Sequence, residues 1–341
     1  MAVSKRRRVR IKKPPVLFLK TQALIARAEE HLGIPLICYW TSAGGAVCSD
    51  DVLALYEILK ELGPQKHVAL LIKSGGGSGE ASLRLIHLLR QYTKKITALI
   101  PLDCASAATM LALGADELRM GPLAHLTAVD TSLRHELSPV DVDNELVSVS
   151  QDELLRVVRL WKETSRTKGT ADEVNPYQAL FAHVHPLVIG AVDRISSLSV
   201  KLCQEILSFH MKDVQRAESI SRHLSEGYPS HDYPITLREA QRIGLSASPM
   251  DPALNELLLE LNALYSEMGQ KALTDYDRTS YHSHEIVNIV EGRGTQIYFQ
   301  NDKDWHYRKE ERRWAKLNDQ SAWYRLQKVK RLIQRKVLHI R

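Results

Sequence analysis

The chain has 341 residues, 44% of them hydrophobic, and a formal net charge of +6 at pH 7. This length and apolar content can bury one large core with appendages, which excludes a disordered or fibrous protein. Four scattered cysteines without a CxxC pair exclude a disulfide-rich scaffold, and no apolar run approaches the roughly 20 residues that span a bilayer. We therefore expect a protein without a transmembrane segment, with reduced thiols and a cytoplasmic location, and the basic start of the chain lacks the clean apolar core of a secretory signal.

Charge is distributed unevenly along the chain. Residues 1–13 contain seven Lys and Arg and no acidic residue, residues 303–341 have a net charge of +9, and the segment between them has a net charge near −10. Basic ends of this kind can contact nucleic acid, an anionic membrane surface or an acidic neighbouring protein. The alternative is that they are solubilising tails.

In chain order, the first informative segment is a short apolar run at 68–72 that ends in the turn Ser74-Gly75-Gly76-Gly77-Ser78-Gly79 and leads into an amphipathic stretch. The pattern predicts a buried strand, a glycine turn and a helix. A second apolar run, 96–102, ends at Asp103-Cys104-Ala105-Ser106-Ala107-Ala108 and leads into another helix. Two successive units of this type predict parallel strands, with both turns at the sheet edge where open α/β sheets usually place their sites.

The two turns together suggest an oxyanion pocket facing a serine nucleophile. Glycines allow backbone amides to approach a ligand closely, and such amides stabilise a developing oxyanion. Ser106, at the start of the second helix, is the preferred nucleophile; the alternative is that it only caps that helix. A dinucleotide fingerprint is excluded because Glu80 occupies the position of its third glycine, and no Gly-Lys-Ser/Thr follows for a P-loop.

Three blocks resemble the serine dehydrogenase proteinase family, a branch of the ClpP/crotonase fold that includes ClpP and signal peptide peptidase. The resemblance covers about residues 31–258. The blocks are the turn 74–77, which is similar to the family's T/S-P-G-G; residues 106–117, similar to its S-G-G-T-x-x-A-x-x-A-D-E; and residues 230–236, close to its T-H-D-Y-P-I. The resemblance implies an α/β, ClpP/crotonase-like fold of repeated β-β-α units arranged as a superhelix.

The resemblance also implies site residues. Ser106 matches the nucleophile, the N–H groups of Gly76 and Ala107 match the two oxyanion donors, and Asp232 matches the aspartate of the ClpP triad. The family's His-Gln element would fall near Val129-Asp130, where no histidine stands, so the general base stays open. His231 is the first candidate for this base, and the others are Lys73, which would form a serine-lysine dyad, His125, and Asp130, which could orient a base.

The remaining segments complete a predicted domain organisation. A basic tail spans 1–15, the ClpP/crotonase-like domain spans 16–262 with an insertion at about 134–173, and a basic extension spans 263–341. Leu326, Val329, Ile333 and Val337 fall at helical spacing, so we expect a helical C-terminal extension with an amphipathic helix that docks on another protomer or binds nucleic acid.

His282 and His284 would share one face of a short strand, but without a third ligand the pattern does not indicate a metal site.

The sequence therefore favours a serine peptidase that acts on peptides or proteins, needs no cofactor and assembles as a homo-oligomer. Nothing in it indicates a pyridoxal lysine or a nicotinamide fingerprint. Two alternatives stay open: a crotonase-type acyl-CoA enzyme that uses the same amide pocket, and a non-catalytic relative that serves as an assembly or nucleic-acid-binding protein.

Overall fold

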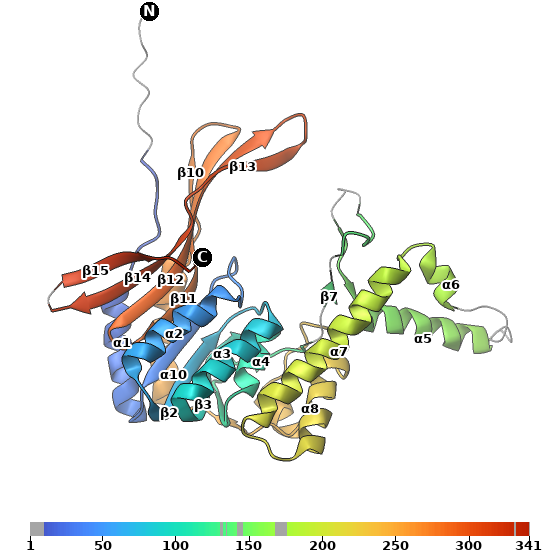
Figure 1. Cartoon of the computed structure of the whole chain (residues 1–341), viewed down its shortest axis with the longest axis horizontal. Coiled ribbons are helices and arrows are strands. Elements are labelled where there is room, and N and C mark those ends of the chain that lie inside the picture. Colours follow the sequence, from blue (N-terminus) through green and yellow to red (C-terminus); the bar gives the residue numbers. More distant parts are fainter. Residues whose placement is uncertain are drawn as a thin grey trace, which may run out of the picture.

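A mixed 11-stranded sheet with helices on both faces forms the body of the protein (Figure 1). The computed structural model describes residues 10–129, 132–133, 135–141, 146–167, 176–330 and 332–340. The strand order is β15-β14-β12-β11-β1-β2-β3-β5-β9, with β10 paired to β11 and β13 to β12. The fold is therefore α/β, as predicted.

The parallel half of the sheet carries the predicted turns. It consists of β1 (Leu36–Thr41), β2 (Gln65–Lys73), β3 (Thr93–Ile100), β5 (Glu117–Met120) and β9 (Ala247–Pro249). Helix α3 (Gly79–Tyr92) follows β2, and α4 (Ala107–Leu113) follows β3 and the short β4 (Asp103–Cys104). Both predicted strand-turn-helix units are confirmed.

Helices cover the two faces of this sheet because side chains alternate along each buried strand. On β2, for example, Leu70 and Ile72 pack in one cluster with α2, α3 and α4, while Ala69 and Leu71 pack in the other with α1 and α10. The helices that complete these layers are α1 (Phe18–Leu32), α2 (Asp50–Leu62), α8 (Val214–Glu226), α9 (Leu237–Arg242) and α10 (Pro252–Met268). In the described part of the chain, no helix combines the length and apolar content needed to cross a bilayer.

The C-terminal extension is built of strands, so the predicted amphipathic helix is wrong. Residues 272–338 form β10 (Ala272–Asp275), β11 (Ser280–Gly292), β12 (Thr295–Arg308), β13 (Arg313–Asp319), β14 (Ala322–Val329) and β15 (Leu332–Leu338). The helical spacing spans two strands of a hairpin whose turn contains Lys330 at φ 56°. Aromatic and β-branched residues favour strands, and β11, β12 and β14 bury apolar side chains such as Ile289, Ile297 and Leu326 in the body of the protein. Since β11 pairs with β1, the segment after residue 262 continues the body of the fold.

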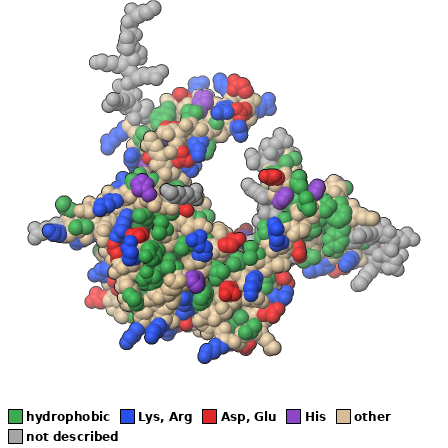
Figure 2. Space-filling model, in the orientation of Figure 1, with side chains coloured by type: hydrophobic (Ala, Val, Ile, Leu, Met, Phe, Trp, Pro, Cys, Tyr) green, Lys and Arg blue, Asp and Glu red, His purple; other side chains and the backbone are tan. Residues whose placement is uncertain are grey.

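The predicted insertion belongs to an arm that projects from the body (Figure 1). The arm contains β7 (Ser132–Leu133), β8 (Val149–Ser150), α5 (Gln151–Thr167), α6 (Pro176–Phe181) and the first half of α7 (Pro186–Ser208). Val149, Leu154, Val188 and Val192 form its small core. A hollow separates the arm from the C-terminal strands (Figure 2).

A buried carboxylate connects the two halves of the sheet. Asp51 accepts hydrogen bonds from the Tyr39 hydroxyl at 2.6 Å, the Cys48 N–H at 2.8 Å and the Asn288 side-chain amide at 2.8 Å. These donors come from β1, the loop before α2, and β11. Burial raises the pKa of Asp51 to about 6, against these hydrogen bonds, which lower it.

This raised pKa predicts a specific pH dependence of stability. A group whose folded-state pKa lies above its unfolded value stabilises the fold when protonated, and this contribution is lost as pH rises through about 6. The free energy of unfolding of the native protein, relative to Asp51→Asn, should therefore be greater at pH 4 than at pH 8, by up to about 3 kcal/mol. Urea denaturation of both proteins across this range measures the difference, and a constant difference would contradict the assignment.

Candidate functional site

The glycine turn and the serine turn lie side by side at the carboxyl end of the parallel strands. Ser74 forms a parallel bridge with Cys104, its N–H donates to the Asp103 carbonyl at 3.2 Å, and its carbonyl accepts from the Ala105 N–H at 2.9 Å. The backbone after β2 therefore runs in register with the backbone that enters α4. This pairing brings the two sequence motifs together.

Gly76 lies directly against Ser106. Its φ is +108°, and a Cβ added there would stand 2.7 Å from the Ser106 Cβ and 3.0 Å from the Ala105 carbonyl oxygen. The next residue, Gly77, has φ +144° and packs equally closely on the backbone of Val47. Only glycine fits these two positions, because a side chain would meet both steric conflict and an unfavourable backbone conformation.

Ser106 has a backbone conformation that L-residues rarely adopt, with φ 53° and ψ −118°. It stands at the N-cap of α4, yet its side chain makes no capping hydrogen bond. Ser78, at the N-cap of α3, makes the ordinary bond and accepts from the Ala81 N–H at 3.1 Å. Ser49 at the N-cap of α2 and Thr236 at the N-cap of α9 also make no capping bond, but both have an ordinary negative φ, so the positive φ is what distinguishes Ser106. Strain of this kind is common at catalytic centres.

A threonine pair holds the strained residue. The Ser106 N–H donates to Thr127 Oγ1 at 2.9 Å, and the Thr127 N–H donates to Thr109 Oγ1 at 3.2 Å. Thr109 in turn donates to the Cys104 carbonyl at 2.8 Å. Both threonines are buried. Thr127 follows β6 (His125–Leu126), which pairs with β4, so the sheet fixes this network beside the serine turn.

Two backbone amides lie beside Ser106. The N–H of Ala107, the first residue of α4, has no hydrogen-bond partner among the described residues. The N–H of Gly76 donates to the buried Ser74 hydroxyl over a long distance of 3.2 Å, and that hydroxyl also accepts from Thr41 at 2.9 Å. The buried Ala107 amide thus has no partner of its own in this part of the chain, whereas the Gly76 amide already has a weak one.

His231 and Asp232 are exposed side chains of the loop between α8 and α9. Within the described ranges, no hydrogen bond joins the Ser106 hydroxyl to another side chain. The loop is nevertheless tied to the site, because Ile235 and Leu126 exchange backbone hydrogen bonds of 2.8 and 2.9 Å. Leu126 immediately precedes Thr127.

The other candidate bases have different surroundings. Lys73 contacts the Thr41 carbonyl at 3.3 Å, forms an ion pair with Asp103 at 3.5 Å and lies over the Trp40 ring. These contacts account for its charge without Ser106. His125 is half-buried on β6, two residues before Thr127. Asp130 lies outside the described residues.

The two histidines of β11 are buried and lie next to acidic side chains. His282 and His284 are both buried on this strand, and His282 Nδ1 lies 2.9 Å from Asp304 while His284 Nε2 lies 3.4 Å from Asp302. The expected shared face is confirmed. No group of three or more side chains suited to a metal ion occurs in the described portion of the chain.

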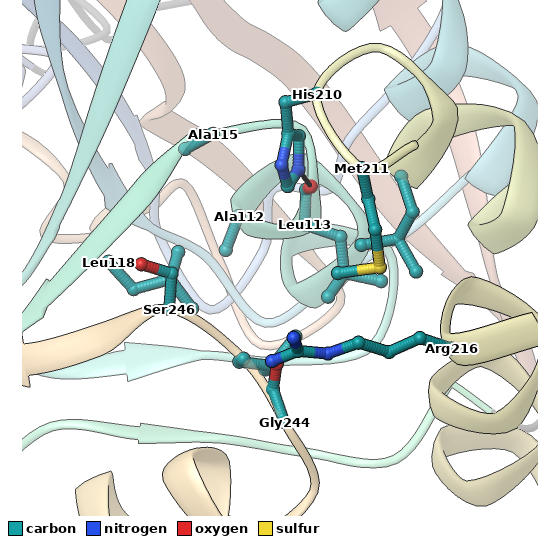
Figure 3. Close-up of a pocket in the computed structure, with 11 residues that line it drawn as sticks. Ala112, Leu113, Ala115, Leu118, His210, Met211, Arg216, Gly244 and Ser246 are labelled. Atoms are coloured by element: carbon teal, nitrogen blue, oxygen red, sulfur yellow. Dashed lines mark hydrogen bonds between the residues drawn. The ribbon is translucent and has the colours of Figure 1, made fainter. Parts of the chain in front are cut away.

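A small cavity of about 160 Å³ is lined by residues that include Leu113, His210 and Arg216 (Figure 3). Leu113 is the last residue of α4, so the cavity lies at the end of this helix opposite Ser106. Its two basic side chains are both engaged with backbone carbonyls: His210 Nε2 donates to Leu113 at 2.8 Å and Arg216 donates to Gly244 at 2.6 Å. The cavity therefore marks the junction of α4, α7 and α8. Because both basic side chains bind the protein itself, the surroundings of Ser106 are the stronger candidate site.

Sequence reasoning missed the residues that support the site, namely Ser74, Thr109 and Thr127. Thr109 lies in the block that resembles the protease family, but its role depends on Thr127, 18 residues later. Nothing in the sequence predicts the two-residue strands β4 and β6 that bring these side chains together.

Comparison with known proteins gives limited similarity. No family model matches the chain. The uncharacterized protein MJ1495 of Methanocaldococcus jannaschii is 25% identical over 269 residues, 77% of each chain, and the uncharacterized protein MJ0137 of the same organism is 25% identical over 215 residues, 62% of this chain and 64% of the other.

Among solved structures, a mutant of the 1510-N membrane-bound stomatin-specific protease is 13% identical, with a TM-score of 0.37, covering 69% of this chain and 86% of that chain. A mutant of ClpP1 from Listeria monocytogenes is 11% identical, with a TM-score of 0.35, covering 70% of this chain and 99% of that chain.

The close approach of the two turns predicts different effects for adjacent glycines. Gly76→Ala should lower the free energy of unfolding by about 2 kcal/mol or more, because its Cβ would meet Ser106 at a positive φ. Gly75→Ala is the matched control, since its Cβ would enter open space. Chemical denaturation of both variants measures the difference, and equal stabilities would refute the packing described here.

Proposed function

We propose that this protein is a serine hydrolase that cleaves peptide bonds through Ser106. The observation that carries the proposal is the strained backbone of Ser106, which lies against Gly76 and makes no capping bond. A serine on a sharp strand-to-helix turn has its hydroxyl exposed to a substrate, as at other nucleophile turns. The resemblance of residues 74–77, 106–117 and 230–236 to a protease family supports the same assignment.

The proposed reaction is acyl transfer followed by hydrolysis. Ser106 Oγ attacks the substrate carbonyl while a base accepts its proton, and the Ala107 N–H stabilises the oxyanion together with Gly76, whose amide would exchange its weak bond to Ser74. Collapse breaks the carbon–nitrogen bond, and the protonated base transfers its proton to the leaving amine. Water then attacks the ester, which releases the acid and restores Ser106.

His231 is the proposed base. Its loop is joined by the Ile235–Leu126 pairing to the strand that holds Thr127. Lys73 is less suitable because its ammonium group is paired with Asp103. Asp232, next in sequence to His231, and Asp130, which directly follows the described residue Val129, are the two carboxylates proposed to orient the imidazole.

The finer features implied by the family resemblance belong to the same proposal. They are the crotonase-like superhelical repeat, a homo-oligomeric assembly, a cytoplasmic location and a peptide or protein substrate. The successive units β2-α3 and β3-β4-α4 are consistent with such a repeat, since both return to the sheet in parallel.

A fluorophosphonate probe tests the nucleophile. We expect one adduct on Ser106 in the native protein, located by peptide mapping, and none in Ser106→Ala. Ser78→Ala is the control serine variant, because Ser78 is committed to its capping bond and should leave labelling of Ser106 in place. An unlabelled native protein would refute the peptidase proposal, and a CoA-dependent activity that survives Ser106→Ala would support the acyl-CoA alternative instead.

The labelling rates of variants test the base. His231→Gln should lower the labelling rate by about 100-fold or more, because Ser106 would lose the group that accepts its proton. His125→Gln and Lys73→Met should retain most of it. A comparison of Asp232→Asn with Asp130→Asn then identifies the orienting carboxylate as the one whose removal gives the larger decrease. Unchanged labelling in His231→Gln would reject His231 as the base.

A further inference from the structure

A pocket of about 550 Å³ lies between the segment after β5 and the N-terminal ends of α9 and α10. Most of its walls are apolar, and the side chains that line them include Met120, Pro122, Ala124, Leu237 and Met250. Pockets that bind small ligands in proteins measure about 300–1,000 Å³ and combine apolar walls with a few polar groups. All residues that line this pocket lie in the described part of the chain. Its size and lining therefore suit a small, largely apolar ligand.

Backbone hydrogen bonds hold the walls of this pocket in place. The Met250 N–H donates to the Met120 carbonyl at 2.9 Å, which joins the segment before α10 to the end of β5. Asp251 caps α10, because its side chain accepts from the Leu254 N–H at 2.9 Å. The pocket is thus formed by paired backbone as well as by side chains. A preformed site of this kind loses little conformational freedom when a ligand binds.

Asn255, in the second turn of α10, is the buried polar side chain of the pocket. The residue is 3% exposed, and its Oδ1 has no hydrogen-bond partner within the described ranges. Gly121 lies directly against it, since a Cβ added there would stand 2.2 Å from Asn255 Oδ1. Buried polar atoms in native proteins are nearly always paired, and an unpaired one is costly. The unpaired carboxamide therefore indicates a ligand with a complementary polar group.

The charged side chains at the pocket favour a neutral ligand. Arg238 and Glu256 both line it, both are exposed to solvent, and their charges are opposite. The described lining therefore has no excess of either sign that would attract an ion.

We propose that this pocket binds an apolar residue of a peptide, with the backbone amide of that residue paired to the Asn255 carboxamide. A carboxamide presents an acceptor and a donor side by side, and another amide is the group that complements both. The apolar walls remove the side chain of the bound residue from water. The proposed binding is separate from catalysis and does not depend on Ser106 acting as a nucleophile.

Methyl NMR of the full chain with ¹³C-labelled methionine methyl groups tests this proposal. The probe is N-acetylphenylalaninamide, and a molecule of this size should bind with a Kd of about 1 mM. We expect its addition to shift the resonances of Met120 and Met250, which line the pocket, and to leave that of Met268 unchanged. Met120→Leu and Met250→Leu assign the two resonances. Absence of any shift, or a shift of Met211 alone, which lines the cavity of Figure 3, would overturn the proposal.

A second pair of measurements tests the role of Asn255. Asn255→Leu should weaken binding of N-acetylphenylalaninamide about tenfold, because the ligand amide would lose its partner. Asn262→Leu is the matched control, since it makes the same exchange on α10 at a residue outside the pocket, and it should bind the probe like the native protein. Circular dichroism checks that both variants are folded. Equal affinities of the native protein and Asn255→Leu would reject the amide pairing.

Two further probes test the ligand class on the native protein, independently of any variant. Methyl 3-phenylpropanoate has a similar apolar group but no N–H donor, so it should bind about tenfold more weakly than N-acetylphenylalaninamide. Equally tight binding of this ester would overturn the proposal and assign the pocket to apolar molecules in general. 3-Phenylpropanamide has one amide and no peptide backbone, and tighter binding of this probe than of N-acetylphenylalaninamide would overturn the assignment to a peptide.

Discussion

The contact between Gly76 and Ser106 is the constraint on which the candidate site depends. Two strand-turn-helix units can place their turns on one sheet edge and still leave them too far apart for chemistry. Here the Ser74–Cys104 bridge continues the parallel register beyond the strands, and the missing Cβ of Gly76 lets the backbones meet. The amides of one turn consequently lie beside the hydroxyl-bearing residue of the other, as oxyanion stabilisation requires.

The glycine turn is held from its other side by the C-terminal half of the sheet. Val47 accepts from the Ser78 N–H and donates to the Gly76 carbonyl, while the neighbouring Ala46 carbonyl accepts from Asn288 on β11. Asn288 also binds Asp51, the carboxylate buried beneath this loop. The strands after residue 262 therefore support the candidate site as well as the sheet.

The sequence predicted those parts of the structure that depend on short-range patterns. The apolar runs, the glycine turn and Ser106 lie close together in the chain, and their order alone implies parallel strands. The C-terminal strands were missed because residues 326, 329, 333 and 337 have helical spacing, whereas hairpin pairing such as Val329 with Leu332 depends on a turn at Lys330. Thr127 could not be predicted, since its role follows from the pairing of strands only two residues long.

The position of Ser106 is difficult to explain by stability alone. A positive φ at a non-glycine residue costs on the order of 1–3 kcal/mol, and an ordinary helix start recovers part of its cost through a capping bond. Ser78 follows this rule at α3, but Ser106 does not at α4. Instead, Thr127 binds the Ser106 amide and leaves the hydroxyl without a partner among the described residues. A glycine at this position would avoid the strain, so what the serine adds is its hydroxyl group, which is the group that the proposed nucleophile needs.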